Sequence, residues 1–188
     1  MALFSFGNSK LPKSTGIFNI TPALYCASRK LGLCQLDAPG QCYALKAERM
    51  YTAVLPYRLR QTEYFDSTSA FDFAVDFLAE VSRKREPVTA LRFSEAGDFR
   101  NQADVDKAEY IARLLAVVDV KCYCYTARSD LDFRDCRTLV VNGSGFMVHN
   151  AFVVTADPQP EAVTCPGNCR TCDACATKNG AVTYVNLH

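Results

Sequence analysis

The stretch VTALRFSEAGDFRNQADVDKAEYIARLLAVVDVKCYCYT, residues 88–126, indicates the fold class. "VTALRF" at 88–93 is short, β-branched at its start and bounded by Pro87 and the "EAGD" turn, so it predicts a buried strand. Apolar residues then recur at helical spacing from Val105 to Leu115, with Asn101 as the cap. "VDVKCYCYT" at 118–126 alternates as a strand. Strand, helix and strand in this order are typical of a parallel α/β unit.

The flanking segments extend this pattern in both directions. Upstream, "GIFNI" at 16–20 predicts a strand, and "CYALKAERMYTAVL" at 42–55 predicts a helix that Pro56 ends. A stronger helix is expected after the Ser69–Asp72 capping pattern. Its predicted buried face holds Phe71, Ala74, Val75, Leu78 and Val81. Downstream, "RTLVVNG" at 137–143, "FMVHNAFVV" at 146–154 and "NGAVTYVNLH" at 179–188 read as further strands.

We therefore expect a small partial (open) α/β barrel with a Cys-rich C-terminal segment packed back on it. The chain length suits a single domain, 1–188, with a body at 1–156 and a Cys-rich tail and closing strand at 157–188. The loops "LDAPGQ" at 36–41 and "DPQPE" at 157–161 interrupt the pattern. Ligands of such sheets sit at the carboxyl ends of the strands, so the turns beginning at Ser94, Thr126 and Asn142 should face one site.

Charge and hydropathy exclude several classes of function. The 21 basic and 20 acidic residues nearly balance, which gives no signal for nucleic acid or an anionic membrane. The basic runs at 57–61 and 82–86 read as solvated helix ends. The sequence contains no secretory signal pattern and no apolar stretch of about 18 residues, so we expect a cytoplasmic protein that does not span a membrane.

Four cysteines gather in "TCPGNCRTCDAC" at 164–175. In a reducing compartment such a group is more often metal-binding or catalytic than disulfide-bonded. The order C-x3-C-x2-C-x2-C resembles a permuted ferredoxin run, whereas structural zinc usually takes ligand pairs from two chain segments. We predict that Cys165, Cys169, Cys172 and Cys175 hold an iron–sulfur cluster, with zinc and free thiols as the alternatives.

A second group, Cys26, Cys34 and Cys42, has seven residues in each gap. Three ligands on a four-iron cluster leave one iron open to a small molecule. Cys42 would start a helix, where the positive end of the dipole favours a thiolate. Buried thiols without a metal, or one site shared with the tail cysteines, are the alternatives.

The remaining polar and cysteine residues divide into candidates and core. Ser94, Glu95 and Asp98 follow a buried strand and could hold an amino group, a ribose or a proton; as an alternative, the carboxylates only solvate a turn or cap a helix. Cys122 and Cys124 are expected in the core, with Tyr123 and Tyr125 on the other face of their strand. Cys136 favours neither role.

These residues carry a family resemblance. The chain resembles the phage-encoded gene product 88 family in "GNSKL" at 7–11, "IFNITPALYCAS" at 17–28, "CYA" at 42–44, "SEAGDF" at 94–99, "YCYTARSD" at 123–130 and the tail motif. That family looks like a reduced relative of radical S-adenosylmethionine enzymes, whose cysteines stand as C-x3-C-x2-C rather than C-x7-C-x7-C. The resemblance implies a phage origin, an open cluster on Cys26, Cys34 and Cys42, and Glu95 and Asp98 facing the cofactor.

Three functions follow as hypotheses. The first is a 4Fe-4S protein, with one or two clusters, that acts on a small molecule at an open iron, with S-adenosylmethionine as the cofactor that the analogy allows. The second is a non-catalytic iron–sulfur protein that is structural, redox-sensing or electron-carrying; a zinc-stapled interaction module is a third. The partner is a small molecule or a host or phage protein, in the cytoplasm of the infected host. The sequence names no catalytic residue.

Overall fold

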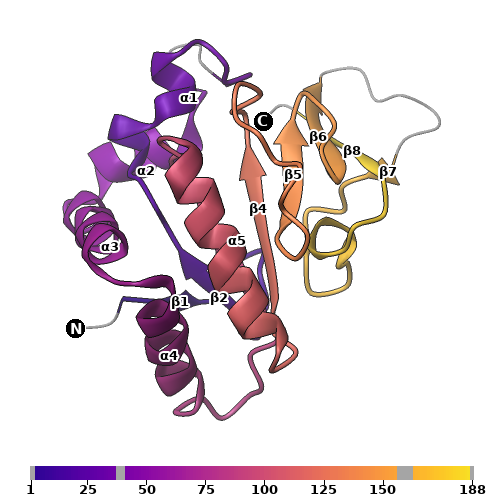
Figure 1. Cartoon of the computed structure of the whole chain (residues 1–188). Coiled ribbons are helices and arrows are strands. Elements are labelled where there is room, and N and C mark those ends of the chain that lie inside the picture. The colour runs from indigo at the N-terminus through magenta and orange to yellow at the C-terminus, as the bar shows by residue number, and fades with distance from the viewer. Residues whose placement is uncertain (1–2, 37–40, 156–162, 187–188) are drawn as a thin grey trace.

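The computed structural model describes residues 3–36, 41–155 and 163–186. These residues form one mixed α/β structure around an eight-stranded sheet in the order β1-β2-β3-β4-β5-β6-β8-β7 (Figure 1). The strands are β1 (Ser5–Phe6), β2 (Thr15–Phe18), β3 (Ala90–Phe93), β4 (Lys121–Thr126), β5 (Val140–Ser144), β6 (Asn150–Thr155), β7 (Val163–Thr164) and β8 (Val182–Asn186). β1 runs antiparallel to β2, and every other neighbouring pair is parallel.

The helices are concentrated in the first two thirds of the chain. They are η1 (Ala23–Tyr25), α1 (Ala27–Lys30), α2 (Tyr43–Met50), α3 (Val54–Ser67), α4 (Ala70–Val81) and α5 (Gln102–Ala116), followed in the tail by the short turn η2 (Ala174–Ala176). The caps read from the sequence are confirmed. Ser69 Oγ accepts the Asp72 N–H at 3.0 Å, and Asn101 Oδ1 accepts the Asp104 N–H at 3.1 Å. An observed strand overlaps each predicted one, at 16–20, 88–93, 118–126, 137–143, 146–154 and 179–188, but the observed strands are shorter, and β6 begins only at Asn150.

The helix predicted to end at Pro56 is wrong in its bounds. α2 ends at Met50, and α3 begins at Val54 and runs through Pro56. Pro56 lies in the first turn of α3, where a backbone N–H has no partner within the helix and its absence costs nothing. The basic run at 57–61 is therefore not a solvated helix end, because Arg58 is buried inside α3. Residues 82–86 are exposed just after α4, as expected.

The buried face of α4 agrees with the expected one only in part: Ala74 is buried, and Leu78 and Val81 pack against the core. Phe73 and Phe77 are fully buried, whereas Phe71 and Val75 are 60% and 47% exposed. "AFDFAVDF" offers apolar side chains in two directions, and contact with other rings selects between them. Phe73 lies edge-on to Phe4 and Phe18, with ring centroids 5.3 and 4.8 Å apart. The sheet therefore determines which stripe is buried.

The two faces of the sheet have different character. Helices α4 and α5 cover one face, where Leu91, Phe93, Cys122 and Cys124 join the main apolar core. Tyr123 points to the other face, where it packs with Ala90 and Val140. The expected division of β4 between core cysteines and opposite tyrosines is thus confirmed. Cys136 also lies in the main core.

β5 and β6 are parallel although only the residues 145–149 join them. Most parallel pairs need a crossover of a dozen residues or more. Here the chain turns back sharply: Gly145 has φ +84°, and a Cβ on Gly143 would lie 2.2 Å from the Phe146 carbonyl oxygen. Only glycine fits such a close approach. The turn places the start of β6 beside the middle of β5.

The two loops expected from the sequence fall wholly or partly outside the described residues. The "DPQPE" loop at 157–161, the boundary at 156/157 and the middle of the "LDAPGQ" loop lie there. The tail does return to the body, because β8 adds to the sheet beside β6. No helix in the described part of the chain has both the length and the apolar character needed to cross a membrane.

Candidate metal site

The Cys-rich tail is held against the open face of the sheet by polar anchors. Asn142 Nδ2, on β5, donates to the Cys175 carbonyl at 2.9 Å, and Asn150 Nδ2, on β6, donates to the Thr177 carbonyl at 2.8 Å. The two asparagines are bonded to each other at 3.0 Å. At the other end of the loop, Cys169 N donates to the Lys10 carbonyl at 3.1 Å. The loop is therefore positioned by three separate parts of the body.

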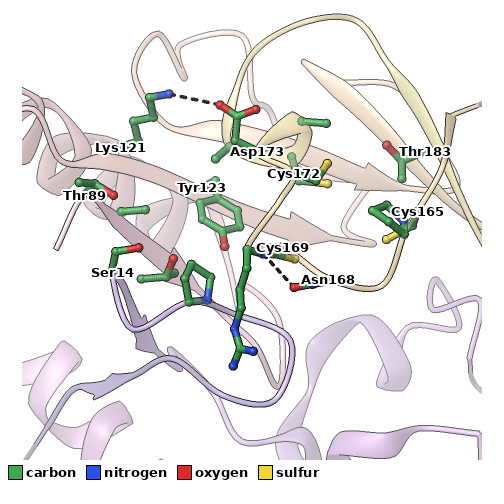
Figure 2. A pocket seen from close by; sticks show the side chains of 18 of the residues that line it. Ser14, Thr89, Lys121, Tyr123, Cys165, Asn168, Cys169, Cys172, Asp173 and Thr183 are labelled. Atoms are coloured by element: carbon green, nitrogen blue, oxygen red, sulfur yellow. Dashed lines mark hydrogen bonds and ion pairs between the residues drawn. The ribbon is translucent and has the colours of Figure 1, made fainter. Parts of the chain in front are cut away.

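The four tail cysteines line one cavity of about 500 Å³ between the tail and the sheet. Its floor is formed by Tyr123 and Tyr125, and its walls by the tail loop and by the starts of β3 and β4. Figure 2 shows the sulfur atoms of Cys165, Cys169 and Cys172 turned toward a common space. The cysteines that line it are Cys165, Cys169, Cys172 and Cys175.

The cavity has both neutral and charged groups at its boundary. Burial raises the pKa of the Cys169 and Cys175 thiols above the ordinary value, and neighbouring thiolates add to this effect. The hydrogen bond from Tyr125 acts in the opposite direction on the pKa of Cys175. At the rim, Lys121 Nζ lies 3.8 Å from Asp173 Oδ2 (Figure 2). A positive ion or a cluster with bound iron would favour the thiolate form that burial opposes.

Within the described residues, no three His, Cys, Asp or Glu side chains approach closely enough to hold one metal ion. The tail thiols share a cavity without forming a tight tetrahedron. A donor set of four thiols still has the chemistry of zinc or of an iron–sulfur cluster, because soft sulfur ligands select these groups.

The second cysteine group begins where β2 has ended, at the carboxyl edge of the sheet. Cys26 is buried and follows η1, whose first two N–H groups, of Ala23 and Leu24, donate to the Glu48 carboxylate at 2.7 and 2.8 Å. Arg58 Nη1 completes this network at 2.7 Å from Glu48. The pKa of the Cys26 thiol is raised to about 11, mainly by burial and less by the charges of Asp98 and Cys34, against the opposing effect of backbone hydrogen bonds from Arg29 and Ser28.

Cys34 and Cys42 are held in place by different contacts. Cys34 is half-buried and lies close enough to Cys26 for the charge of one to affect the other. Its neighbour Gln35 accepts the Val154 N–H at 3.2 Å, so this loop reaches across to β6. Cys42 caps α2, as predicted, with its Sγ accepting the Leu45 N–H at 3.4 Å. None of Cys26, Cys34 and Cys42 lines the tail cavity.

The predicted cofactor-binding residues occupy the same carboxyl edge but differ in their surroundings. Asp98 is buried and accepts hydrogen bonds from Thr126 Oγ1 at 2.7 Å, from the backbone N–H groups of Ala127 and Phe99 at 2.8 Å each, and from Ser28 Oγ. Because Ser28 belongs to α1, Asp98 ties the Cys26 segment to the ends of β3 and β4. The turns after β3 and β4 therefore meet, while Asn142 is bonded to the tail.

Glu95 and Ser94 do not have the several hydrogen-bond donors that surround Asp98 in the described structure. Glu95 is half-buried, and Asn8 Nδ2 donates to its Oε1. Ser94 is buried with φ +55°, and its hydroxyl has no hydrogen-bond partner among the described residues. Burial raises the pKa of Asp98, although the four donors oppose that effect.

One residue of this region escaped the sequence analysis. Arg92, in the middle of β3, projects onto the face that the tail covers, since the alternating neighbour Ala90 lines the cavity. The signal was present in the sequence: a single cation within "ALRF", between apolar residues of a strand that is otherwise buried. A charge in a largely buried strand normally has an ion-pair partner or binds a ligand.

A comparison with known proteins places the chain in a family. No curated protein and no solved structure matches it. A family model described as "Gene product 88" matches residues 2–156, which include Cys26, Cys34, Cys42 and the carboxyl-edge residues but not the tail motif. That match covers most of the sequence, and the chain therefore belongs to the gene product 88 family.

Proposed function

We propose that this protein binds a 4Fe-4S cluster through Cys165, Cys169, Cys172 and Cys175. The observation that carries the proposal is that all four thiols line one cavity of about 500 Å³. The close sequence spacing supports a cluster over a single zinc ion, because each thiolate can take a different iron. When bound, the cluster would cross-link the tail and exchange single electrons.

We propose a second, open cluster at Cys26, Cys34 and Cys42. Three features support it. The charge of Cys34 affects the pKa of Cys26, and Cys42 lies at the start of α2. The group also lies at the carboxyl edge, where sheets of this kind bind ligands. A cluster with three thiolate ligands leaves one iron for a small molecule, S-adenosylmethionine included. Ser94 and Glu95 would contact that molecule, while Asp98 would position the Cys26 segment.

The fold proposal is an open α/β barrel of the radical S-adenosylmethionine kind. Its support is the sequential order of the strands from β2 to β6, with α4 and α5 on one face and the tail on the other. With the family's phage origin, the proposal places the protein in the cytoplasm of an infected host. Its partner would be a small molecule or a host or phage protein.

The non-catalytic alternative has support of its own. Both Asp98 oxygens already accept hydrogen bonds from the protein, which leaves this residue a structural role. The four tail thiols would saturate a cluster and leave no iron open. A zinc-stapled tail, which would be colourless, fits the same donor set.

The test is anaerobic purification followed by an absorption spectrum and by iron and sulfide analysis. It is repeated on Cys169→Ala and Cys34→Ala. Cys122→Ala is the matched control, because Cys122 lies in the core on the opposite face of β4. We expect brown protein, a loss of about half the iron in each site variant on the two-cluster proposal, and full iron in the control.

Three outcomes would decide between the hypotheses. Colourless protein with bound zinc contradicts the iron–sulfur proposal. Complete loss of iron in both site variants contradicts two clusters and indicates one shared site. For the open cluster, electron paramagnetic resonance of the reduced protein should shift when S-adenosylmethionine is added, and an unchanged spectrum would favour the non-catalytic alternative.

A further inference from the structure

A half-buried cation, Arg92, lies near Cys169 of the tail and has no ion-pair partner among the described residues. Arg92 Nε is buried and has no hydrogen-bond partner, and within the described residues no ion pair joins Arg92 to an acid. Burying an unpaired charge is costly, and proteins normally pair it. Arg58, the buried arginine of α3, shows the usual solution, with Glu48 at 2.7 Å. Arg92 is therefore an exception that calls for a ligand.

Aromatic residues lie next to this cation. The guanidinium carbon lies 4.9 Å from the centre of the Tyr125 ring, and Arg92 stands opposite Tyr123 in the register of β3 and β4. Burial acts to lower the pKa of Arg92, whereas the charge of Glu95 and the charges that Tyr43, Tyr125 and Tyr123 acquire only at high pH raise it above the ordinary arginine value, so Arg92 is charged at neutral pH. The rings stack on the guanidinium but supply no formal negative charge.

Glu95, the acidic residue that affects the pKa of Arg92, forms no ion pair with it. Glu95 acts on Arg92 only at long range, and its Oε1 accepts a hydrogen bond from Asn8. Two buried hydroxyls in the same region also have no partner: Ser94 Oγ, just after β3, and Thr21 Oγ1, after β2. Unpaired buried polar atoms are rare in native proteins. Here a cation and two hydroxyl donors lie unpaired in the segments where two adjacent strands end.

We propose that Arg92 binds the oxyanion group, carboxylate or phosphate, of a small-molecule ligand on the tail-covered face of the sheet. A guanidinium presents two parallel N–H groups that match both oxyanions. Arg92 does not itself line the tail cavity, but its guanidinium carbon lies 4.9 Å from the ring of Tyr125, which does, so the proposed oxyanion site lies beside the space proposed for the tail cluster. This site requires no metal and goes beyond the proposed cluster function.

The test measures thermal unfolding of the full-length protein, by circular dichroism, in increasing sodium phosphate or sodium acetate. Sodium chloride at equal ionic strength is the reference. We expect the midpoint to rise with phosphate, acetate or both beyond the chloride reference. Phosphate also stabilises folded proteins in general by exclusion from their surface, so only the part of the response that Arg92→Gln removes counts as binding. Such a response to phosphate alone indicates a phosphorylated ligand, and to acetate alone a carboxylate.

Substitutions test whether the rise of the unfolding midpoint depends on Arg92. Arg92→Gln should abolish it, and Arg92→Lys should weaken the apparent affinity at least about tenfold, because an ammonium cannot form the paired bonds. Arg60→Gln is the matched control, since the Arg60 guanidinium carbon lies 5.9 Å from the Tyr57 ring centre on α3. It should respond like the wild type. Cys169→Ala should also respond, which separates this site from the proposed tail cluster.

A second measurement uses the protein without added oxyanion. Because Arg92→Gln removes a half-buried charge whose Nε is buried without a partner among the described residues, its midpoint should rise, by roughly 2–4 °C for each kcal/mol gained in a chain of this length. Equal responses to chloride and to both oxyanions in the wild type would overturn the proposal. So would an Arg92→Lys variant, folded like the wild type, that binds both oxyanions with unchanged affinity.

Discussion

At the scale of single residues, Glu48 is the most consequential buried charge of the N-terminal region. Its carboxylate accepts two N–H groups of η1 and pairs with Arg58, with side-chain exposures of 2% and 9% for the pair. Glu48→Gln should lower the free energy of unfolding by about 3–5 kcal/mol, because it leaves Arg58 buried without its counter-charge. Urea unfolding followed by circular dichroism measures the change.

The control for this prediction is Glu80→Gln. Glu80 pairs with Arg83 at 3.6 Å across an exposed surface, where the Arg83 side chain is 72% exposed. Solvent screens such pairs, so the expected change is at most about 1 kcal/mol. Similar effects of the two substitutions would show that the Glu48 network does not stabilise the fold as inferred.

His149 gives a pH dependence with a defined sign. Burial lowers its pKa below the ordinary 6.5, and its Nδ1 accepts the Val141 N–H at 3.0 Å, which only neutral imidazole can do. The unfolded chain then binds the proton more readily than the folded one. Stability from this group is complete above pH 6.5 and is lost as the pH falls through and below that value.

The comparison variant is His149→Asn, whose side-chain oxygen can accept the same N–H without titrating. Urea unfolding at about pH 7.5 and about pH 5.0, roughly one unit above and one and a half units below the His reference pKa, should show a larger loss of stability in the wild type. Equal losses in the two proteins would mean that His149 does not contribute to the pH dependence.

At the scale of elements, Gly97 controls how closely the ends of β2 and β3 approach. Its φ is +69°, and a Cβ would lie 1.9 Å from the Thr21 carbonyl oxygen. Gly97→Ala should therefore cost about 3 kcal/mol or more, from backbone strain and a steric clash together. Gly32 has nearly the same φ, +68°, and a Cβ added there would meet nothing within 4 Å.

The matched substitution Gly32→Ala isolates the strain. It should cost only about 1–2 kcal/mol, the conformational part alone. Chemical unfolding of the two variants measures the difference between them. If they lose equal stability, the close contact at Gly97 yields at little cost and does not fix the spacing of the strand ends.

At the scale of the whole molecule, the tail and the body are stabilised by different forces. The body has a continuous apolar core between the sheet, α4 and α5, whereas the tail loop is held mainly by polar anchors to Asn142, Asn150 and Lys10. On the proposed cluster function, removal of the metal with a chelator should loosen the tail and spare the body.

Hydrogen exchange measured by mass spectrometry tests this separation. Amides of residues 165–178 should exchange at least about tenfold faster after chelation, while those of β3, β4 and α5 stay protected. Uniform deprotection across the chain would show that the metal is required for the whole fold. Unchanged exchange in the tail would contradict a structural role for a bound metal there.

The sequence by itself determined the order of most strands and helices and the capped starts of α4 and α5. The spacing of hydrophobic residues, the capping residues and the alternation of β4 are local properties, and the tertiary structure contains the elements they predict. It also singled out seven cysteines as metal-ligand candidates by their spacing. Pro56 was misread because proline is unfavourable inside a helix but compatible with its first turn.

Only the tertiary structure decided which of these residues meet. The face that α4 buries depends on Phe4 and Phe18 from distant segments, and the tail cavity depends on tyrosines of β4. That Arg92 has no ion-pair partner among residues 3–36, 41–155 and 163–186 likewise becomes visible only when the strands and loops are in place. Spacing along a chain identifies ligand types, whereas burial and the absence of a counter-charge are properties of packing between segments far apart in sequence.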